Sequence, residues 1–188
     1  AKASSTNLWG EVHLSDGRKL VGWLSLSYGR RLELYDPGAK KWRKLHLSEL
    51  TRMDASIRSE ELEREWRWQE GGSDVKVYTG RGYPRRWLDH TCRLKNKETF
   101  LGHLNGAVLH VTVPAKKASR RETKKDEAKK KDPKSKDTPE KRGPLKKRFI
   151  LRQYERGKLG TTLKDLVYVK SIVIIGKPPA EGDPPQPR

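Results

Sequence analysis

Hydrophobic and polar positions alternate along two stretches of the chain that share one pattern. Residues 12–24 read VHLSDGRKLVGWL, and residues 92–104 read CRLKNKETFLGHL. Apolar residues at every second position are typical of half-buried strands, and the Asp-Gly pair in the first stretch favours a tight turn. Each stretch therefore predicts a strand, a turn and a second strand. Gly22 and Gly102 stand inside the second strands, which requires a sharp bend or the close approach of another backbone.

The similarity between the two stretches continues beyond these strands. Residues 31–34 resemble 148–151, and residues 47–53 resemble 163–169. The first pair of segments lies 117 positions apart, against 80 for the opening strands, so 37 residues are inserted in the second copy. Five short strands and a helical turn per copy predict an all-β protein of two small barrels. A core of about 50 residues is marginal alone, so the two barrels are expected to pack together.

The pattern divides the chain into five parts. We expect a loose N-terminus at 1–7, a first barrel at 8–53, a linker at 54–90, a second barrel at 91–175 and a Pro-rich tail at 176–188.

The linker has a pattern of its own. Residues 59–69 predict a short helix, because Glu60 and Arg64 have the spacing of a helical ion pair and two glycines follow the stretch. The two tryptophans in the same stretch also fit a strand.

The insert has the composition of a disordered segment. Residues 115–147 contain fifteen Lys and Arg and six Asp and Glu, a net charge of +9. They contain almost no apolar residue, so they cannot contribute to a packed core. We expect a disordered basic loop within the second barrel.

The spacing V-x-L-x-x-G-x-x-L-x-G-x-L in residues 12–24 resembles the first motif of Sm-like proteins, within the wider group of SH3-like small barrels. The resemblance covers the opening strands of both copies and implies the small-barrel fold. Ser25-Leu26-Ser27-Tyr28-Gly29 stands where Sm proteins have Asp-x-x-x-Asn, and their second motif, centred on Arg-Gly, is missing. The RNA pocket and ring assembly of that family are therefore not expected here.

Charge points to polyanions as one class of partner. The chain has 43 Lys and Arg against 24 Asp and Glu, a formal charge of +19, which attracts nucleic acid or other acidic polymers. In residues 78–87, basic side chains that neutralise phosphates alternate with rings that stack on bases. Buried packing of these aromatics against the barrels is the favoured alternative. The candidate polyanion-binding residues are Tyr78, Arg81, Tyr83, Arg85, Arg86, Trp87, Lys129, Lys130 and Lys131.

Catalytic and metal-binding patterns are weak. Cys92 is the only cysteine, and His90 shares its strand face. An activated thiolate is conceivable, but Cys92 matches the core position Val12, so a buried apolar role is favoured. The histidines lack the spacing of a zinc site. No cofactor is expected.

The sequence therefore favours a non-catalytic binding or scaffold module over an enzyme. A protein partner is preferred, with non-sequence-specific nucleic-acid binding as the alternative. No apolar run approaches the roughly 18 residues of a membrane span. The short polar start at Ala1 slightly favours an exported protein whose signal has been removed over a cytoplasmic one. The oligomeric state stays open.

Overall fold

The computed structural model describes residues 7–27, 30–72, 74–114, 143–176 and 178. The predictions for the tail at 179–188, for residues 1–6 and for most of the insert, including Lys129, Lys130 and Lys131, lie outside the described residues. The strands of the first half are β1 (Leu8–Leu14), β2 (Lys19–Leu26), β3 (Leu32–Asp36), β4 (Lys41–Leu45) and β5 (Leu50–Trp68). Those of the second half are β6 (Lys76–Leu94), β7 (Thr99–Leu104), β8 (Ala107–Val113), β9 (Leu145–Leu151), β10 (Tyr154–Arg156) and β11 (Val169–Gly176). Two 3-10 turns, η2 (Leu47–Glu49) and η3 (Leu163–Asp165), complete the described elements, and the all-β class is confirmed.

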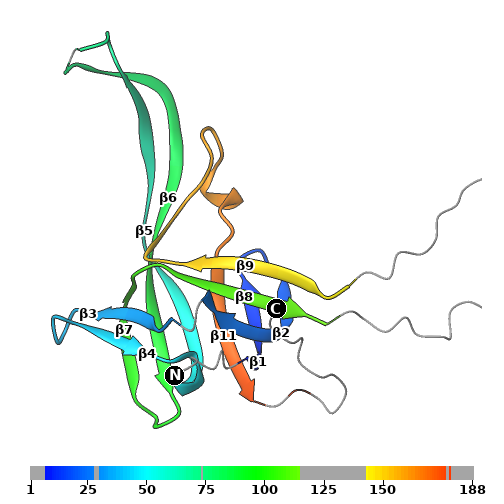
Figure 1. The fold of residues 1–188 in the computed structure, drawn as a ribbon. Helices are drawn as coiled ribbons and strands as arrows, with labels where there is room; N and C mark the ends of the chain where they lie inside the picture. Colours follow the sequence, from blue (N-terminus) through cyan, green and yellow to red (C-terminus); the bar gives the residue numbers. More distant parts are fainter. Residues whose placement is uncertain (1–6, 28–29, 73, 115–142, 177, 179–188) are drawn as a thin grey trace, which may run out of the picture.

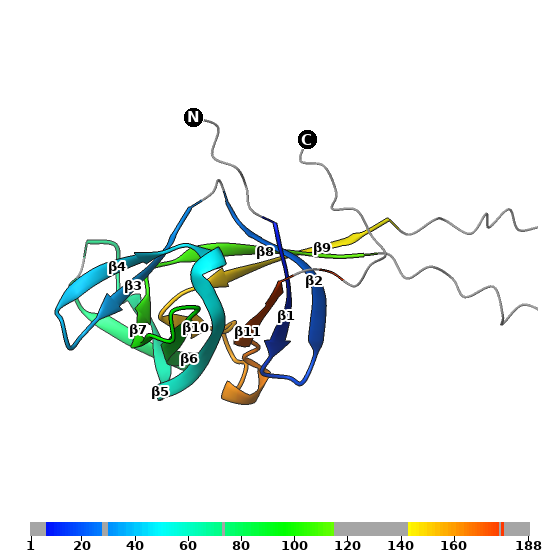
Figure 2. The same ribbon diagram turned by 90° about the horizontal axis from the view of Figure 1, so that it is seen from below.

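The strands form one antiparallel sheet that curls into a half-barrel (Figures 1 and 2). Its order is β4-β3-β7-β6-β5-β11-β1-β2-β8-β9, and β10 pairs with residues 85–87 of β6 on the side away from β5. Buried side chains from both halves, among them Val12, Leu34, Leu109 and Ile172, form a single core cluster. Alternate residues of β1, β2 and β8 point into this core, as the sequence pattern predicts.

The strand order joins the two halves of the chain more closely than the sequence predicts. β2 pairs with β8 instead of β3, and β7 pairs with β3 instead of β8. The order thus contains two matching runs, β11-β1-β2-β8-β9 and β5-β6-β7-β3-β4, each with strands of both halves. The assignment of one barrel to 8–53 and another to 91–175 is corrected accordingly. The physical reason is that strands with the same hydrophobic pattern can replace each other as neighbours.

Gly22 and Gly102 occupy equivalent places in the two runs. A Cβ on Gly22 would fall on the carbonyl oxygen of Thr112 in β8, and one on Gly102 would fall on that of Tyr35 in β3. In both cases the neighbouring backbone comes from the other half of the chain. The predicted close approach is therefore the reason for both glycines.

Two matches between the halves are corrected by the register. Leu34 of β3 faces Leu104, and Val111 of β8 faces Leu24, so the counterpart of β3 is β8 and not residues 148–151. The insert consequently lies between β8 and β9, where β3 and β4 are joined by a short turn.

The ends of the two halves also differ by three residues. η2 and η3 begin at the matched positions Leu47 and Leu163, as predicted. Beyond them, Met53 faces Cys92 and Ile172 faces Val12, so Ile172 and not Val169 is the counterpart of Met53. Three residues, 166–168, are added before β11.

The predicted helix at 59–69 is wrong, and the linker at 54–90 consists mainly of two long paired strands. β5 and β6 pair from Leu50–Leu94 outward to Trp68–Lys76. Glu60 forms its ion pair across the strands with Arg86, at 2.6 Å, and not along a helix with Arg64. The helical spacing of charges misled the sequence prediction, because the pairing partner lies more than 20 residues away and local periodicity does not reveal it.

Candidate functional site

The outer parts of β5 and β6 form a two-stranded arm, defined here as residues 57–68 and 76–88. The arm rises away from the other strands, and the segment that carries η3 stands beside its lower part (Figure 1). Several large apolar side chains on it are exposed to solvent, with Leu62 59% and Tyr78 58% exposed. The others on the arm are Ile57, Trp66, Trp68 and Val77. An isolated ribbon with this much exposed apolar surface is typical of an interaction element.

Three of the predicted polyanion-binding residues, Tyr83, Arg85 and Trp87, share one face of the arm. The Arg85 guanidinium lies 4.3 Å from the Trp87 ring centre and 4.6 Å from that of Tyr154 in β10. Arg156 lies 4.0 Å above the Tyr83 ring. These ring faces are thus already covered by the protein's own cations. Tyr83 and Trp87 are half-buried in this arrangement, whereas Tyr78 is exposed.

Carboxylates on β5 neutralise the same face. Glu63 lies 3.2 Å from Arg156 and 3.7 Å from Arg85, and Glu61 accepts a hydrogen bond from Trp87 Nε1 at 3.2 Å. The sequence analysis missed Tyr154 and Arg156 as members of this cluster. Their alternation in Arg152-x-Tyr154-x-Arg156 is the signal that could have indicated it, because it mirrors the pattern of residues 83–87.

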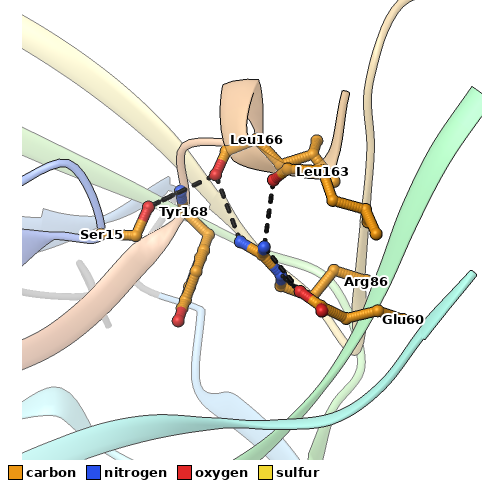
Figure 3. A network of polar contacts seen from close by, with 6 residues as sticks. All are labelled: Ser15, Glu60, Arg86, Leu163, Leu166 and Tyr168. Atoms are coloured by element: carbon orange, nitrogen blue, oxygen red, sulfur yellow. Dashed lines mark hydrogen bonds and ion pairs between the residues drawn. The ribbon is translucent and has the colours of Figure 1, made fainter. Parts of the chain in front are cut away.

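Arg86 points to the opposite face and is buried, with 8% of its surface exposed. Its guanidinium donates to Glu60 and to the carbonyl oxygens of Leu163 and Leu166, at 2.7, 3.0 and 3.3 Å (Figure 3). Its role is therefore to fasten the η3 segment to the base of the arm, and the prediction that it contacts phosphate is not supported by its position.

Arg81 and Tyr78 lie farther along the arm. Arg81 forms an exposed ion pair with Glu65 at 3.0 Å. Tyr78 faces Trp66 across the strands, and the amino group of Lys76 lies 4.3 Å from the Trp66 ring centre. The structure therefore spreads the predicted residues over two faces and the tip of the arm and does not bring them together into one basic patch.

The free edge of the arm belongs to β5. β11 pairs with β5 only at residues 52–54, and among the described residues no other strand lies on that side. The edge of β6 is covered in the lower part of the arm, because β10 pairs with residues 85–87 and Gly157 and Gly160 donate to the carbonyl oxygens of Pro84 and Gly82.

The direction of these two hydrogen bonds shows which backbone groups of β5 point away from β6. In an antiparallel pair, the N–H and C=O of one residue point to the same side. The carbonyls of Pro84 and Gly82 point away from β5, so the facing residues Leu62 and Arg64 point their own N–H and C=O away from β6. Glu60, two positions earlier in the same ladder, does the same. The β5 edge thus offers unpaired donors and acceptors at Glu60, Leu62 and Arg64.

The two end strands of the sheet differ from this edge. β4 carries Lys41, Arg43 and Lys44, and β9 carries Lys146, Lys147 and Arg148. Clustered basic side chains on an edge strand disfavour pairing with another chain. The whole stretch from 57 to 88, which is the arm together with its connecting turn, has seven basic and six acidic residues and is close to neutral.

One hollow on the surface is rich in cations. It has a volume of about 720 Å³ and is lined by Arg30, Arg31, Lys44, Glu33 and residues 105–107. Glu33 is engaged by Lys44 at 3.5 Å and by the Asn105 side-chain amide at 3.1 Å. The two arginines leave the hollow with an excess of positive charge, which suits an anion.

Cys92 and His90 are both in the interior. Cys92 is fully buried in the core cluster, and burial raises the pKa of its thiol to about 12. Burial, with a smaller contribution from His103, lowers the pKa of His90 to about 4. At neutral pH a neutral thiol beside a neutral imidazole is poorly suited to nucleophilic attack. The described residues contain no group of three His, Cys, Asp or Glu able to hold a metal, and none of their helices has the length and apolarity to cross a membrane.

Comparison of the chain with protein-family models, with curated proteins and with solved structures found no match.

Proposed function

We propose that this protein is a non-catalytic binding module that adds a strand of a protein partner to the free edge of β5. The observation that carries the proposal is the outward direction of the backbone groups of Glu60, Leu62 and Arg64 on a projecting arm. Adding a strand satisfies these groups with main-chain hydrogen bonds, while exposed side chains such as Leu62 supply contact area.

The scaffold that presents the arm is, in this proposal, a pair of SH3-like or Sm-like small barrels that have exchanged strands. Support comes from the two matching five-strand runs, the equivalent glycines Gly22 and Gly102, and the 3-10 turns before β5 and β11. In this proposal the exchange makes the scaffold rigid, because the two halves of the chain cannot separate without breaking the β2–β8 and β3–β7 pairs.

Selection from a display library of random twelve-residue peptides tests the proposal. Recovered peptides should be extended and alternate apolar with polar residues. They should lose most of their affinity for Leu62→Pro, which removes an outward N–H without breaking a bond to β6. The control Leu145→Pro, at the first residue of the edge strand β9, should bind as the wild type does. Peptides that bind Leu62→Pro equally well would overturn the proposal.

A second candidate function is non-sequence-specific binding of a polyanion. The hollow with Arg30, Arg31 and Lys44 favours it, together with the net charge of +19. Binding of this kind weakens linearly with the logarithm of salt concentration. Titration of heparin at several salt concentrations should show a reduced slope for Arg30→Gln with Arg31→Gln, and an unchanged slope for Leu62→Pro.

A further inference from the structure

We propose that the partner strand on the β5 edge is the β5 strand of a second copy of this chain. The inference rests on the proposed function and names its partner. It follows from the order of side chains along the edge, Glu60-x-Leu62-x-Arg64, which reads as a charge, an apolar residue and the opposite charge.

The regular part of the β5–β6 ladder includes residues 59–64, and within it Glu60, Leu62 and Arg64 share one face. Two antiparallel copies related by a two-fold axis at Leu62 place the two Leu62 side chains opposite each other. The same axis places Glu60 of each copy opposite Arg64 of the other. Opposite charges and apolar pairs directly across antiparallel strands are both favourable.

The backbone agrees with this register. Because all three residues point their N–H and C=O outward, each facing pair is a hydrogen-bonded pair that exchanges two bonds. The two arms then form one continuous four-stranded ribbon in which both β5 edges are satisfied.

Arg64 supplies a further argument. It is exposed, and among the described residues it has no ion pair or side-chain hydrogen bond of its own. Glu60 is still partly exposed while it holds Arg86, and a carboxylate has two oxygens with which to accept from both guanidinium groups. The second copy thus provides the missing partner of Arg64.

The opposite face contains the one unfavourable contact, Glu61 against Glu63 of the other copy. Both carboxylates already have cationic partners, since Glu63 lies beside Arg156 and Arg85 and Glu61 lies beside Arg85. Glu61 also accepts a hydrogen bond from Trp87. An axis at Glu61 would instead place Arg58 against Arg64, and an axis at Glu63 would place Glu61 against Glu65. The axis at Leu62 is therefore the favoured one.

Cysteine cross-linking tests this register in the full chain. In a hydrogen-bonded pair the two Cα atoms are about 5.5 Å apart, which is within the range of a disulfide. Leu62→Cys should therefore form a covalent dimer under mild oxidation. The native Cys92 is fully buried and does not interfere. The controls Tyr78→Cys, on β6 of the arm, and Trp42→Cys, on β4, replace exposed side chains and should form no covalent dimer.

Analytical ultracentrifugation measures the association of the wild type without a cross-link. The mass should rise with concentration toward twice the 21.7 kDa of one chain. Arg64→Glu should weaken association by about tenfold or more, because it turns both Glu60–Arg64 pairs across the two-fold axis into repulsive pairs. The control Lys95→Glu, with the same change of charge in the β6–β7 turn, should associate normally.

A wild type that stays monomeric at high concentration, or a Leu62→Cys variant that cross-links no faster than its controls, would overturn self-pairing. The peptide selection described above separates this result from failure of the proposed function. If random peptides still bind the β5 edge of a monomeric protein, the binding edge is retained and only the identity of its partner is wrong.

Discussion

Acid should destabilise this protein through His90. The imidazole is 2% exposed, pairs through its backbone with Ala55 and Gly102, and has an Nδ1 atom without a hydrogen-bond partner. Burial lowers its pKa from 6.5 to about 4 in the folded state. The unfolded chain binds a proton near pH 6.5 and the folded chain only near pH 4, so stability present at pH 7 is lost as the pH falls between these values.

The size of the effect follows from the shift. Each unit of pKa difference corresponds to 1.36 kcal/mol, so protonation of His90 costs about 3 kcal/mol between pH 7 and pH 4. That is a large share of the roughly 5–15 kcal/mol by which domains are stable. His103 adds to the effect, because a charge on it opposes a charge on His90.

Urea unfolding of the wild type and of His90→Gln at pH 7, 5.5 and 4 measures this contribution. Glutamine does not titrate, so carboxylates such as the half-buried Glu155, whose pKa is raised by burial, affect both proteins equally. The wild type should lose about 3 kcal/mol more than the variant over this range. Stability curves that run parallel would refute the reasoning, since they would mean that His90 gains its proton equally in both states.

Three further substitutions test a close backbone contact, a buried hydrogen-bond network and a turn conformation. Gly102→Ala should lower the free energy of unfolding by about 3 kcal/mol or prevent folding, because its methyl group would fall on the Tyr35 carbonyl. The control Gly71→Ala places its methyl group in open space and should leave the stability unchanged, as measured by thermal unfolding. Arg86→Met should cost about 3 kcal/mol in urea unfolding, because it leaves Glu60 and two carbonyls without their buried partner, and a loss below 1 kcal/mol would contradict that role. Lys97→Gly should add about 1 kcal/mol to the unfolding free energy, because Lys97 has a φ of 70° that glycine adopts without strain.

The sequence predicts the strands of this fold well, because the alternation in residues 12–24 and 92–104 is a property of single strands. It also predicts the purpose of Gly22 and Gly102. It does not predict which strands are neighbours, since β3 and β8 have the same apolar period and either can lie beside β2. The exchange between the halves is decided by packing over the whole chain.

The candidate site was predicted only in part. The aromatic and basic character of residues 78–87 is evident from the sequence, but the partners that cover Arg85 and Tyr83 come from β10, some 70 residues away. The free edge of β5 was missed altogether, because the charges at Glu60 and Arg64 have the spacing of a helix as well as that of a strand. Only the pairing with β6 decides between them.

The most direct test of strand addition at β5 is amide hydrogen exchange at single-residue resolution, with and without a peptide recovered from the display selection. In the free protein at low concentration, the amides of Leu62 and Arg64 should exchange fast and those of Glu61 and Glu63 slowly, because only the latter are bonded to β6. Bound peptide should protect Leu62 and Arg64 and leave the edge of β9 unchanged. Protection that appears at β9, or at none of these amides while the peptide is bound, would contradict strand addition at β5.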